Sequence, residues 1–521
     1  MFCAACDGRR RVSKRVRLMT RLRILLLSGA AVCAAVGNGH ATPTEDSKYD
    51  GSVYPTDVVE PVDARAQSLR VPGWSARTPN TKLEKALGPA AYLVSAQESP
   101  ETFGAAIRRA IGRHPSFHAQ AANLDESDAM RRRARSALYP QLSTQLRGDY
   151  SITRDFAAGT DNVVESLRPR EQFTAGVSAS QLIFDGGATI ARIRSARATD
   201  DEYRNALMTR INDLAISALT AYYDVAAHQA LLAFSEALIR RHEEILADVK
   251  ERERLGAGSK ADVTRAVARL AAAKVKHFDI QESKRIADIR YEEFFGEAPG
   301  RLARPLLDAP DIQTRSETVA VALGENPEIA AAAARADARQ ADLQAAKSAR
   351  MPELRLSVDA VKYDVFDSSD DFDVRAGVNV NYNIFTGGAR AADIAVAKSR
   401  ARREKFNEEQ VRQDVAREAA MAFERLDGAD SRLGSLADAL VAHDETRKLV
   451  LERYRLSRGD LIDVLQAEND YYEAGVAFVI GLSGRDMAGY SLMEQTGDLA
   501  RLFSPQNDYD DAVYGGGVGY E

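Results

Sequence analysis

One long segment of the chain occurs twice, and this duplication limits the possible folds more than any other feature. The matching strings are FDGGA (184–188) with FTGGA (385–389), ERERLGAGSKADVTRA (251–266) with ERYRLSRGDLIDVLQA (452–467), GRHP (112–115) with GENP (324–327), and ALYPQL (137–142) with ARMPEL (349–354). The first two pairs are offset by 201 residues and the last two by 212, so a single difference of 11 residues separates the copies. A repeat of this size is interpreted first, because it determines the architecture of the whole chain.

The first 41 residues are typical of a secretory signal peptide. Eight Lys and Arg side chains between positions 9 and 23 precede the apolar run ILLLSGAAVCAAV at 24–36, which is shorter than the about 20 residues of a membrane-spanning helix. The small residues of GHA at 39–41 predict cleavage after Ala41. Met19 is an alternative start. A lipid anchor on Cys33 is the alternative interpretation, although Val32 stands where a small residue is preferred.

Removal of this segment changes the cysteine content and the charge. All three cysteines, Cys3, Cys6 and Cys33, lie in it, so we expect no disulfide in the mature chain. It also holds eight of the 70 basic residues but one of the 76 acidic residues, which leaves a distinctly acidic protein. An acidic chain argues against a nucleic-acid partner.

The rest of the chain divides into five parts by composition and repetition. Residues 42–100 are rich in Pro, Asp, Ser and Thr and predict a poorly ordered extension. The first copy occupies 101–296 and the second 315–497, with a linker at 297–314 between them. Residues 498–521, which end in GGGVGYE, predict a flexible tail.

Each copy contains two segments in which apolar and polar residues alternate, the pattern of β-strands. The apolar positions in the first copy are Leu142, Leu146 and Tyr150, then Phe173, Ala175, Val177, Ala179 and Ile183. Those in the second copy are Leu354, Leu356, Val358 and Ala360, then Phe372, Val374, Ala376, Val378, Val380, Tyr382 and Ile384. The residues between them are mostly charged, Asn, Ser or Thr. The sequence therefore predicts four strands with one apolar and one strongly polar face.

Two kinds of sheet fit this pattern. The first is a soluble antiparallel sheet with one solvent-exposed face. The second is a membrane barrel with a water-filled lumen, whose tilted strands need about 10 residues to cross the bilayer. A sheet in hydrocarbon must close, because an open edge leaves backbone groups unpaired. Closure takes at least about eight strands, and one chain supplies four. We therefore predict that several chains contribute to one barrel.

The two copies also predict unusually long helices. The stretches 188–255 and 389–457 contain no proline, and helices of this length span about 100 Å. Leu207, Ile211, Leu214, Ala218, Ala221 and Val225 recur at spacings of three and four, the pattern of a coiled coil. Shorter helical stretches at 101–138, 259–295, 314–350 and 460–496 are about half as long. Two of them placed end to end match one long helix, so we expect each long helix to be flanked by two short ones.

In this order and spacing, the motifs resemble those of the TolC family of outer-membrane channel-tunnels. The resemblance covers about 101–497 and rests on the duplication, on YPQL (139–142), on QLIFDGG (181–187) with NIFTGG (383–388), and on GSKADVTRA with GDLIDVLQA. It implies an α+β membrane protein and a homotrimer whose twelve-stranded barrel, four strands per chain, is set in outer-membrane lipid. A coiled-coil α-helical tunnel would continue the barrel across the periplasm.

The resemblance also implies partners: a periplasmic adaptor (membrane fusion) protein and an inner-membrane ABC exporter or RND pump. The segment 218–274 looks more like the branch that serves type I protein secretion. Drug or metabolite efflux by the same architecture remains an alternative. A barrel-anchored adhesin or structural coiled coil is a remote one, because the extension before the first copy is too small for a passenger domain.

Candidate gate residues lie at the turns between the long and the returning helices. By resemblance, Asp463 in DVLQA projects into the closed periplasmic entrance, where three copies form an acidic constriction, and Asp262 is its equivalent in the first copy. Gln466 and Arg265 stand where some family members carry a second acidic residue. Helix capping is the alternative role of both aspartates.

Three further residues lie one turn before these turns: Tyr454, Arg455 and Arg254. Family members use Tyr and Arg there to hold adjacent helix pairs together. A solvated helix face with ordinary neighbouring ion pairs is the alternative for the arginines.

Glycines mark both kinds of turn in each copy. Gly258 and Gly459 lie in the tip turns, and Gly186, Gly187, Gly387 and Gly388 allow the chain to bend from strand into helix. The GG pairs lack the Lys-Ser/Thr of a phosphate-binding loop, and His242-Glu243 lacks the second histidine of a metalloprotease motif. The sequence recommends no catalytic residue, metal site or cofactor, and therefore no enzyme.

Overall fold

The computed structural model describes residues 81–95, 97–98, 100–153, 171–305, 314–366 and 371–505, all of which belong to one unit of the chain, 67–521. The predicted signal peptide at 1–41, the extension up to residue 80, part of the predicted linker (306–313) and most of the predicted tail (506–521) lie outside these residues.

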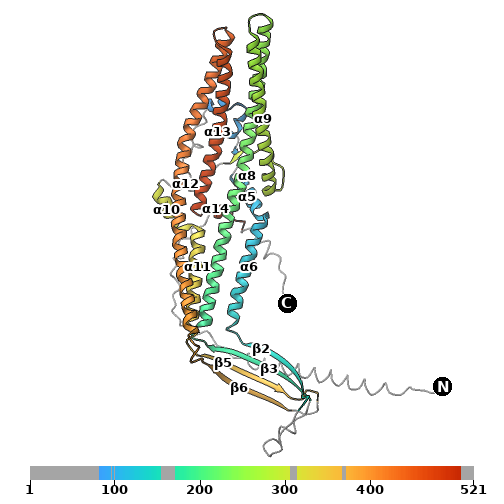
Figure 1. Ribbon diagram of the computed structural model, residues 1–521, viewed down its shortest axis with the longest axis vertical. Coiled ribbons are helices and arrows are strands. Elements are labelled where there is room, and N and C mark those ends of the chain that lie inside the picture. The colour runs from blue at the N-terminus through green and yellow to red at the C-terminus, as the bar shows by residue number, and fades with distance from the viewer. Residues whose placement is uncertain are drawn as a thin grey trace, which may run out of the picture. The chain divides into compact units, whose positions relative to one another are not determined.

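The order of elements repeats, as the duplication predicts (Figure 1). The first copy consists of α5 (Pro100–Arg113), α6 (Pro115–Ser136), β2 (Gln141–Tyr150), β3 (Glu171–Phe184), α8 (Ala188–Arg254) and α9 (Lys260–Phe295). The second consists of α10 (Arg315–Glu325), α11 (Pro327–Ser348), β5 (Glu353–Lys362), β6 (Phe372–Asn381), α12 (Ala389–Arg455) and α13 (Leu461–Gln495). Each stretch predicted as one helix before the strands is two helices, because Pro115 and Pro327 each begin a new one.

The long helices α8 and α12 have 67 residues each, about 100 Å at 1.5 Å per residue. Near the strands α6 packs on α8, and α11 packs on both α8 and α12. Toward the far end α9 returns along α8, and α13 returns along α12 (Figure 1). The predicted flanking of each long helix by two short ones is confirmed. The predicted coiled-coil positions of α8, from Leu207 to Val225, are all buried.

The four strands form one antiparallel sheet in the order β2-β3-β5-β6. Its register aligns Leu142 with Ala179, Ala179 with Val358 and Val358 with Ala376. Because directly paired residues point to the same side of a sheet, the apolar positions of all four strands share one face. Many of their large side chains, from Leu142 to Val380, are exposed.

The 11-residue difference between the copies lies in the connections between strands. Residues 151–170 join β2 to β3, whereas the shorter stretch 363–371 joins β5 to β6. The predicted last strand is also too long. β6 ends at Asn381, so Tyr382 and Ile384 lie outside it. It has 10 residues, whereas β3 has 14 and continues to Phe184.

Two predictions of disorder were wrong in part. Within the predicted extension, α3 (Thr81–Leu87), η2 (Gly88–Ala90) and α4 (Tyr92–Ser95) fold, and β1 (Gln97–Glu98) pairs with β4 (Arg304–Pro305) of the predicted linker. Leu83, Leu87 and Leu93 are buried in the same cluster as Phe234 of α8 and Leu440 of α12. These few apolar side chains fill the space between the long helices. The segment as a whole is polar, so its composition did not predict this packing.

The predicted tail likewise begins with a helix, α14 (Asp498–Phe503), whose Leu499 and Phe503 are buried. They join a cluster with Tyr222 of α8 and Tyr490 of α13. Burial of such side chains stabilises the fold by about 1.5–3 kcal/mol each, which is enough to order a six-residue helix against a preformed surface.

No helix in the described part of the chain is long and apolar enough to cross a membrane.

Candidate functional site

The two tip turns, residues 255–259 and 456–460, close their helices in the same way. Ala257 N–H donates to Arg252 O at 2.8 Å, and Arg458 N–H donates to Arg453 O at 2.9 Å. This bond needs a left-handed residue just after the helix. Gly256 supplies it in the first tip with φ 77°, whereas Ser457 adopts φ 58° in the second. The second tip therefore contains a strained non-glycine residue.

The glycines Gly258 and Gly459 allow the turn to pass close to the helix that it leaves. A Cβ atom on Gly258 would lie 3.0 Å from Glu253 N, and one on Gly459 would lie 3.2 Å from Tyr454 N. Both approaches are too tight for a side chain without movement of the backbone. This explains why each tip motif has glycine at that position.

The strand-to-helix turns use glycine for a different reason. Gly186, Gly187, Gly387 and Gly388 have φ between 60° and 90°, the left-handed region. In the first copy Asp185 also caps α8, because its carboxylate accepts hydrogen bonds from Gly187 N and Thr189 N at 3.0 and 2.7 Å. These turns redirect the chain from the sheet into the long helices.

The two candidate gate aspartates have different surroundings. Asp262 takes part in helix capping: its N–H donates to Ser259 Oγ, which donates back to the Asp262 carboxylate at 2.7 Å. Arg265 lies 3.3 Å from the same carboxylate. Asp463 is exposed, and among the described residues it has no hydrogen-bond or ion-pair partner. Of the two, only Asp463 presents an uncommitted carboxylate at the tip.

Tyr454 connects the two helical hairpins. Its ring is 9% exposed and packs with Ile245 and Val249 of α8. The guanidinium of Arg252, also on α8, lies over that ring at 4.2 Å from its centroid and donates to Tyr454 O at 3.2 Å. Burial raises the pKa of the Tyr454 phenol, and the nearby Arg252 partly offsets this.

The partner of Tyr454 is therefore Arg252, which the sequence did not single out. Arg254 forms an ion pair with Glu251 on its own helix at 2.5 Å, the ordinary role considered for it. Arg455 is exposed and has no hydrogen-bond or ion-pair partner within the described ranges.

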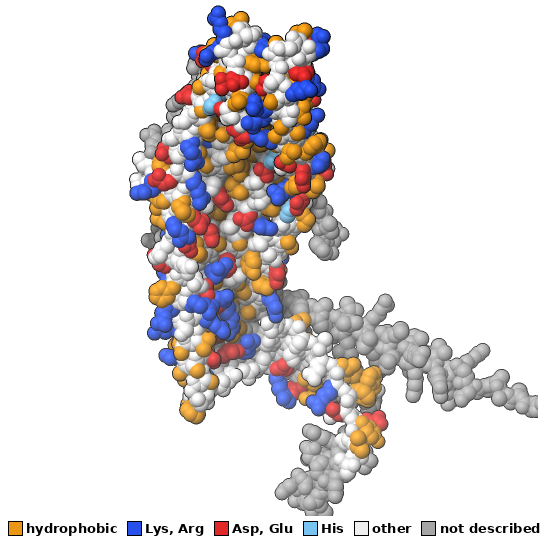
Figure 2. Space-filling model, turned by 45° about the horizontal axis from the view of Figure 1, so that its top comes forward, with side chains coloured by type: hydrophobic (Ala, Val, Ile, Leu, Met, Phe, Trp, Pro, Cys, Tyr) orange, Lys and Arg blue, Asp and Glu red, His pale blue; other side chains and the backbone are white. Residues whose placement is uncertain are grey.

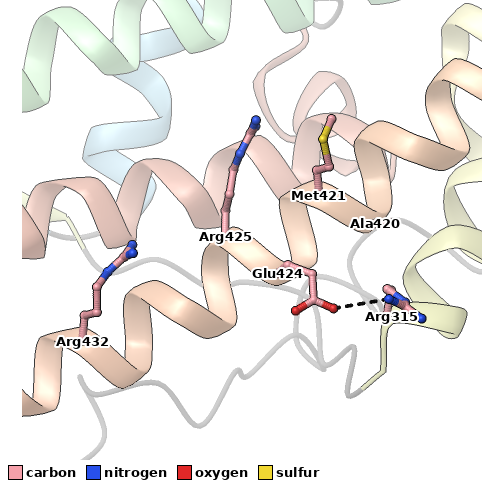
Figure 3. A pocket seen from close by; sticks show the side chains of 6 residues that line it. All are labelled: Arg315, Ala420, Met421, Glu424, Arg425 and Arg432. Atoms are coloured by element: carbon pink, nitrogen blue, oxygen red, sulfur yellow. Dashed lines mark ion pairs between the residues drawn. The ribbon is translucent and has the colours of Figure 1, made fainter.

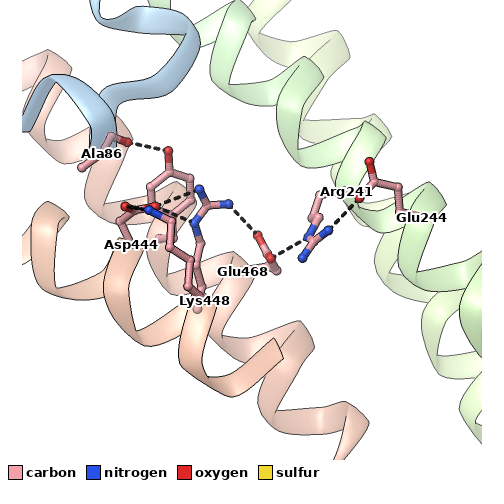
Figure 4. Close-up of polar contacts among 8 residues, drawn as sticks. Ala86, Arg241, Glu244, Asp444, Lys448 and Glu468 are labelled. Atoms are coloured by element: carbon pink, nitrogen blue, oxygen red, sulfur yellow. Dashed lines mark hydrogen bonds and ion pairs between the residues drawn. The ribbon is translucent and has the colours of Figure 1, made fainter. Parts of the chain in front are cut away.

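A network of charged residues lies further from the tips and also joins the hairpins (Figure 4). Glu468 of α13 is almost fully buried and accepts from Arg241 of α8 at 2.9 Å and from Arg447 of α12 at 3.4 Å. Arg447 also pairs with Asp444 at 2.8 Å and lies over the ring of Tyr471 at 3.8 Å from its centroid.

This network also contacts α3, because the Tyr471 hydroxyl donates a hydrogen bond to Ala86 O at 2.7 Å. Sequence reasoning missed the network. Its members lie far apart in the chain, and each looks like an ordinary charged residue on a helix surface. The helix-capping and coiled-coil patterns give no signal for a buried carboxylate at position 468.

One hollow lies on α12 beside α10 and is lined by Arg315, Ala420, Met421, Glu424, Arg425 and Arg432 (Figure 3). Arg315 and Glu424 approach to 3.7 Å across it. Its lining is open and mostly charged, unlike the enclosed apolar pockets that hold small molecules. No group of three or more His, Cys, Asp or Glu side chains arranged to hold a metal ion occurs in the described part of the chain.

An open sheet with an exposed apolar face, continued by two helical hairpins more than 30 residues long, defines a class of protein: the outer-membrane channel component with a TolC-like fold. Comparison with known proteins agrees. Residues 106–296 and 319–481 match the family described as outer membrane efflux protein, once for each copy. The chain therefore belongs to the outer membrane efflux protein family.

Individual relatives are distant but cover most of the chain. Outer membrane efflux protein BepC of Brucella suis is 25% identical over 402 residues, which span 77% of this chain and 86% of BepC. Protein CyaE of Bordetella pertussis is 26% identical over 387 residues, 71% and 78% of the two chains. The open state of the Neisseria gonorrhoeae MtrE outer membrane channel has the same fold, with a TM-score of 0.64 at 20% identity over 76% of this chain and 89% of that one. The protein is thus an efflux channel component of the outer membrane, with its tunnel in the periplasm, and not an enzyme.

Proposed function

We propose that the chain works as a homotrimer in which three four-stranded sheets close one twelve-stranded barrel and the helical hairpins continue as a tunnel. The carrying observation is the sheet: its apolar face is exposed, and β2 and β6 are its open edges. An open edge in hydrocarbon leaves N–H and C=O groups unpaired at several kcal/mol each. Copies of the chain that pair β2 with β6 of a neighbour remove both edges.

In this proposal the trimer is the exit duct of an export system. The tips meet a periplasmic adaptor protein, which connects them to an inner-membrane ABC exporter, and the cargo is a protein secreted by the type I route. The likeness of residues 218–274 to the secretion branch supports this cargo class. Residues 1–41 act as the signal peptide, and cleavage after Ala41 is tested by N-terminal sequencing of the mature protein.

Drug or metabolite efflux with an RND pump is the second candidate, which the name of the relative BepC favours. A deletion strain separates the two. Loss of a secreted protein from the medium with unchanged antibiotic sensitivity supports secretion, whereas increased sensitivity with normal secretion supports efflux.

We further propose that Asp463 is the acidic residue of the periplasmic gate. Three exposed carboxylates near the trimer axis would repel one another, bind cations and favour opening. Asp262 is engaged with Ser259 and Arg265 and is the matched control. In planar bilayers, Asp463→Ala is expected to change the conductance or its block by divalent cations, and Asp262→Ala is not. Equal behaviour of the two variants would remove Asp463 from the gate.

A further inference from the structure

The helix ends next to the sheet are rich in basic residues. The segments 129–140, 188–199, 343–352 and 389–403 adjoin the strands and together contain 14 basic residues and one acidic residue, and five acidic residues lie directly beside them: Asp128, Asp200, Asp342, Glu353 and Glu404. Figure 2 shows a group of Lys and Arg side chains on the helices close to the sheet. By contrast, residues 240–262 around the first tip contain equal numbers of basic and acidic residues. We call the 14 basic residues of the four segments beside the sheet the basic collar. They are Arg131, Arg132, Arg133, Arg135, Arg192, Arg194, Arg197, Lys347, Arg350, Arg390, Lys398, Arg400, Arg402 and Arg403.

Most collar residues form no ion pair or side-chain hydrogen bond with other described residues of the chain. Arg131 and Arg132 pair with Asp128, and Arg403 with Glu404. Within the described ranges, ten other members have no ion pair or hydrogen bond to a side chain, and all ten are exposed. They are Arg133, Arg135, Arg192, Arg194, Arg197, Lys347, Arg350, Lys398, Arg400 and Arg402.

Helix stability explains only part of this charge, because Arg133, Arg135 and Lys347 lie in the last turns of α6 and α11, where the helix dipole favours basic residues. A helix N-terminus is positive and favours acidic residues in its first turns. The first turns of α8 and α12 contain no acidic residue, and three or more basic residues follow within the next turns. Most collar members on α8 and α12 lie beyond the first turn, where the effect of the dipole has faded, so the dipole gives no reason for them. We therefore look for a negatively charged partner outside the chain.

The position of the collar identifies that partner. Exposed aromatic side chains lie at the ends of the strands: Tyr139, Phe184, Tyr382 and Phe385. Aromatic belts of this kind mark the boundary between hydrocarbon and headgroups. The collar begins a few residues beyond them and extends for about 20 Å along the helices. Much of this length lies within the headgroup layer or within one Debye length of it, about 8 Å, so most collar residues are close enough to interact with headgroup charges.

We propose that the basic collar binds the phosphate groups of anionic phospholipids in the periplasmic leaflet of the outer membrane. The inference rests on the proposed barrel, which places the sheet in the bilayer. The long Arg and Lys side chains reach the headgroups, and each side chain close to an anionic surface strengthens association about fivefold. The collar thereby fixes the depth of the channel in the membrane.

The test compares two variants with the same change in charge. The collar variant carries Arg194→Gln, Arg197→Gln, Lys398→Gln and Arg400→Gln. The control carries Lys250→Gln, Arg269→Gln, Arg285→Gln and Arg458→Gln, which replace exposed cations elsewhere on the helices and, at Arg458, in the second tip turn. Native mass spectrometry of the purified full-length protein measures bound phosphatidylglycerol against phosphatidylethanolamine, at low and high salt.

Wild type and control are expected to prefer phosphatidylglycerol, and the collar variant to lose at least about tenfold of that preference. Conservative replacement of Arg194, Arg197 and Arg400 by Lys should retain it. Equal lipid preference of the collar variant and wild type overturns the proposal, as does an equal loss in the control. Competition by inorganic phosphate at the same concentration as the lipid also overturns it, because a simple anion site would then suffice.

The conductance of wild type and of the collar variant is also measured in bilayers of neutral lipid. This measurement separates the test of the basic collar from the test of the proposed barrel. An unchanged conductance with lost lipid preference supports the collar, whereas absence of any channel in wild type refutes the proposed barrel itself.

Discussion

The contact between Arg252 and Tyr454 is predicted to hold the two hairpins together in the closed state. Its two parts are the guanidinium over the ring, worth about 0.5–1 kcal/mol at a partly exposed site, and a charged hydrogen bond to Tyr454 O, worth about 1.5 kcal/mol. On the premise that the contact is made in the closed channel and not in the open one, loss of both parts in Arg252→Gln weakens the closed arrangement by about 2 kcal/mol. A difference of this size changes the ratio of closed to open channels about 30-fold.

Two replacements of Tyr454 test which part of the side chain acts. The contact uses the ring face and the main chain, and no described residue is hydrogen-bonded to the hydroxyl. Tyr454→Phe should therefore leave gating unchanged. Tyr454→Ala removes a buried ring, at a cost of about 3–5 kcal/mol, and should open the channel at least as much as Arg252→Gln.

Single-channel recordings in planar bilayers measure the closed fraction of each variant. Arg254→Gln is the matched control, because the sole ion-pair partner of that arginine among the described residues is Glu251 on its own helix. The reasoning is refuted if Tyr454→Phe opens the channel as much as Tyr454→Ala, which would assign the contact to the hydroxyl. It also fails if Arg252→Gln behaves like Arg254→Gln.

Three further predictions concern stability, measured by thermal unfolding. Ser457→Gly should stabilise the protein by about 0.5–1 kcal/mol, because it relieves a left-handed residue; a lower melting temperature would contradict this. Arg304→Gln should cost about 3–5 kcal/mol, because it leaves the carboxylate of Asp486 buried without its bidentate partner; a near-neutral effect would contradict it. Burial, followed by three neighbouring carboxylates, raises the pKa of Glu494 to about 7. A raised carboxyl pKa gives stability that is complete below about pH 4.5 and is lost as the pH rises through about 7. Glu494→Gln should therefore remove pH dependence from this window, and a variant with the wild-type profile would exclude Glu494 as its source.

The sequence predicts the architecture well because the architecture depends on periodic patterns. Alternation over ten residues specifies a strand, and the three-and-four spacing from Leu207 to Val225 specifies a helix seam. Together with the duplication they were enough for the order of elements. The predictions failed where a few residues act against the composition of their segment, as for α3 and α14, whose buried leucines lie in stretches that are otherwise polar.

The candidate site was harder to predict, because its contacts join residues far apart in the chain. The motif around Asp463 identified the tip, but motif and spacing could not show that Asp262 is engaged with Ser259 while Asp463 has no described partner. Arg252 looks the same in sequence as its neighbour Arg254. Only the packing of α8 against α12 distinguishes them, since it places Arg252 over Tyr454.

The central claim is that three chains close one barrel, and crosslinking of the open edges tests it most directly. Gln145→Cys on β2 and Asn379→Cys on β6 place thiols on the two edge strands, in a chain whose Cys3, Cys6 and Cys33 are replaced by Ser. Outer membranes are treated with a short bis-maleimide and analysed by denaturing electrophoresis, with each single-cysteine variant as the control. A ring of three predicts covalent dimers and trimers from the double variant and nothing larger. Monomer alone, or a ladder that continues beyond the trimer, would contradict the account.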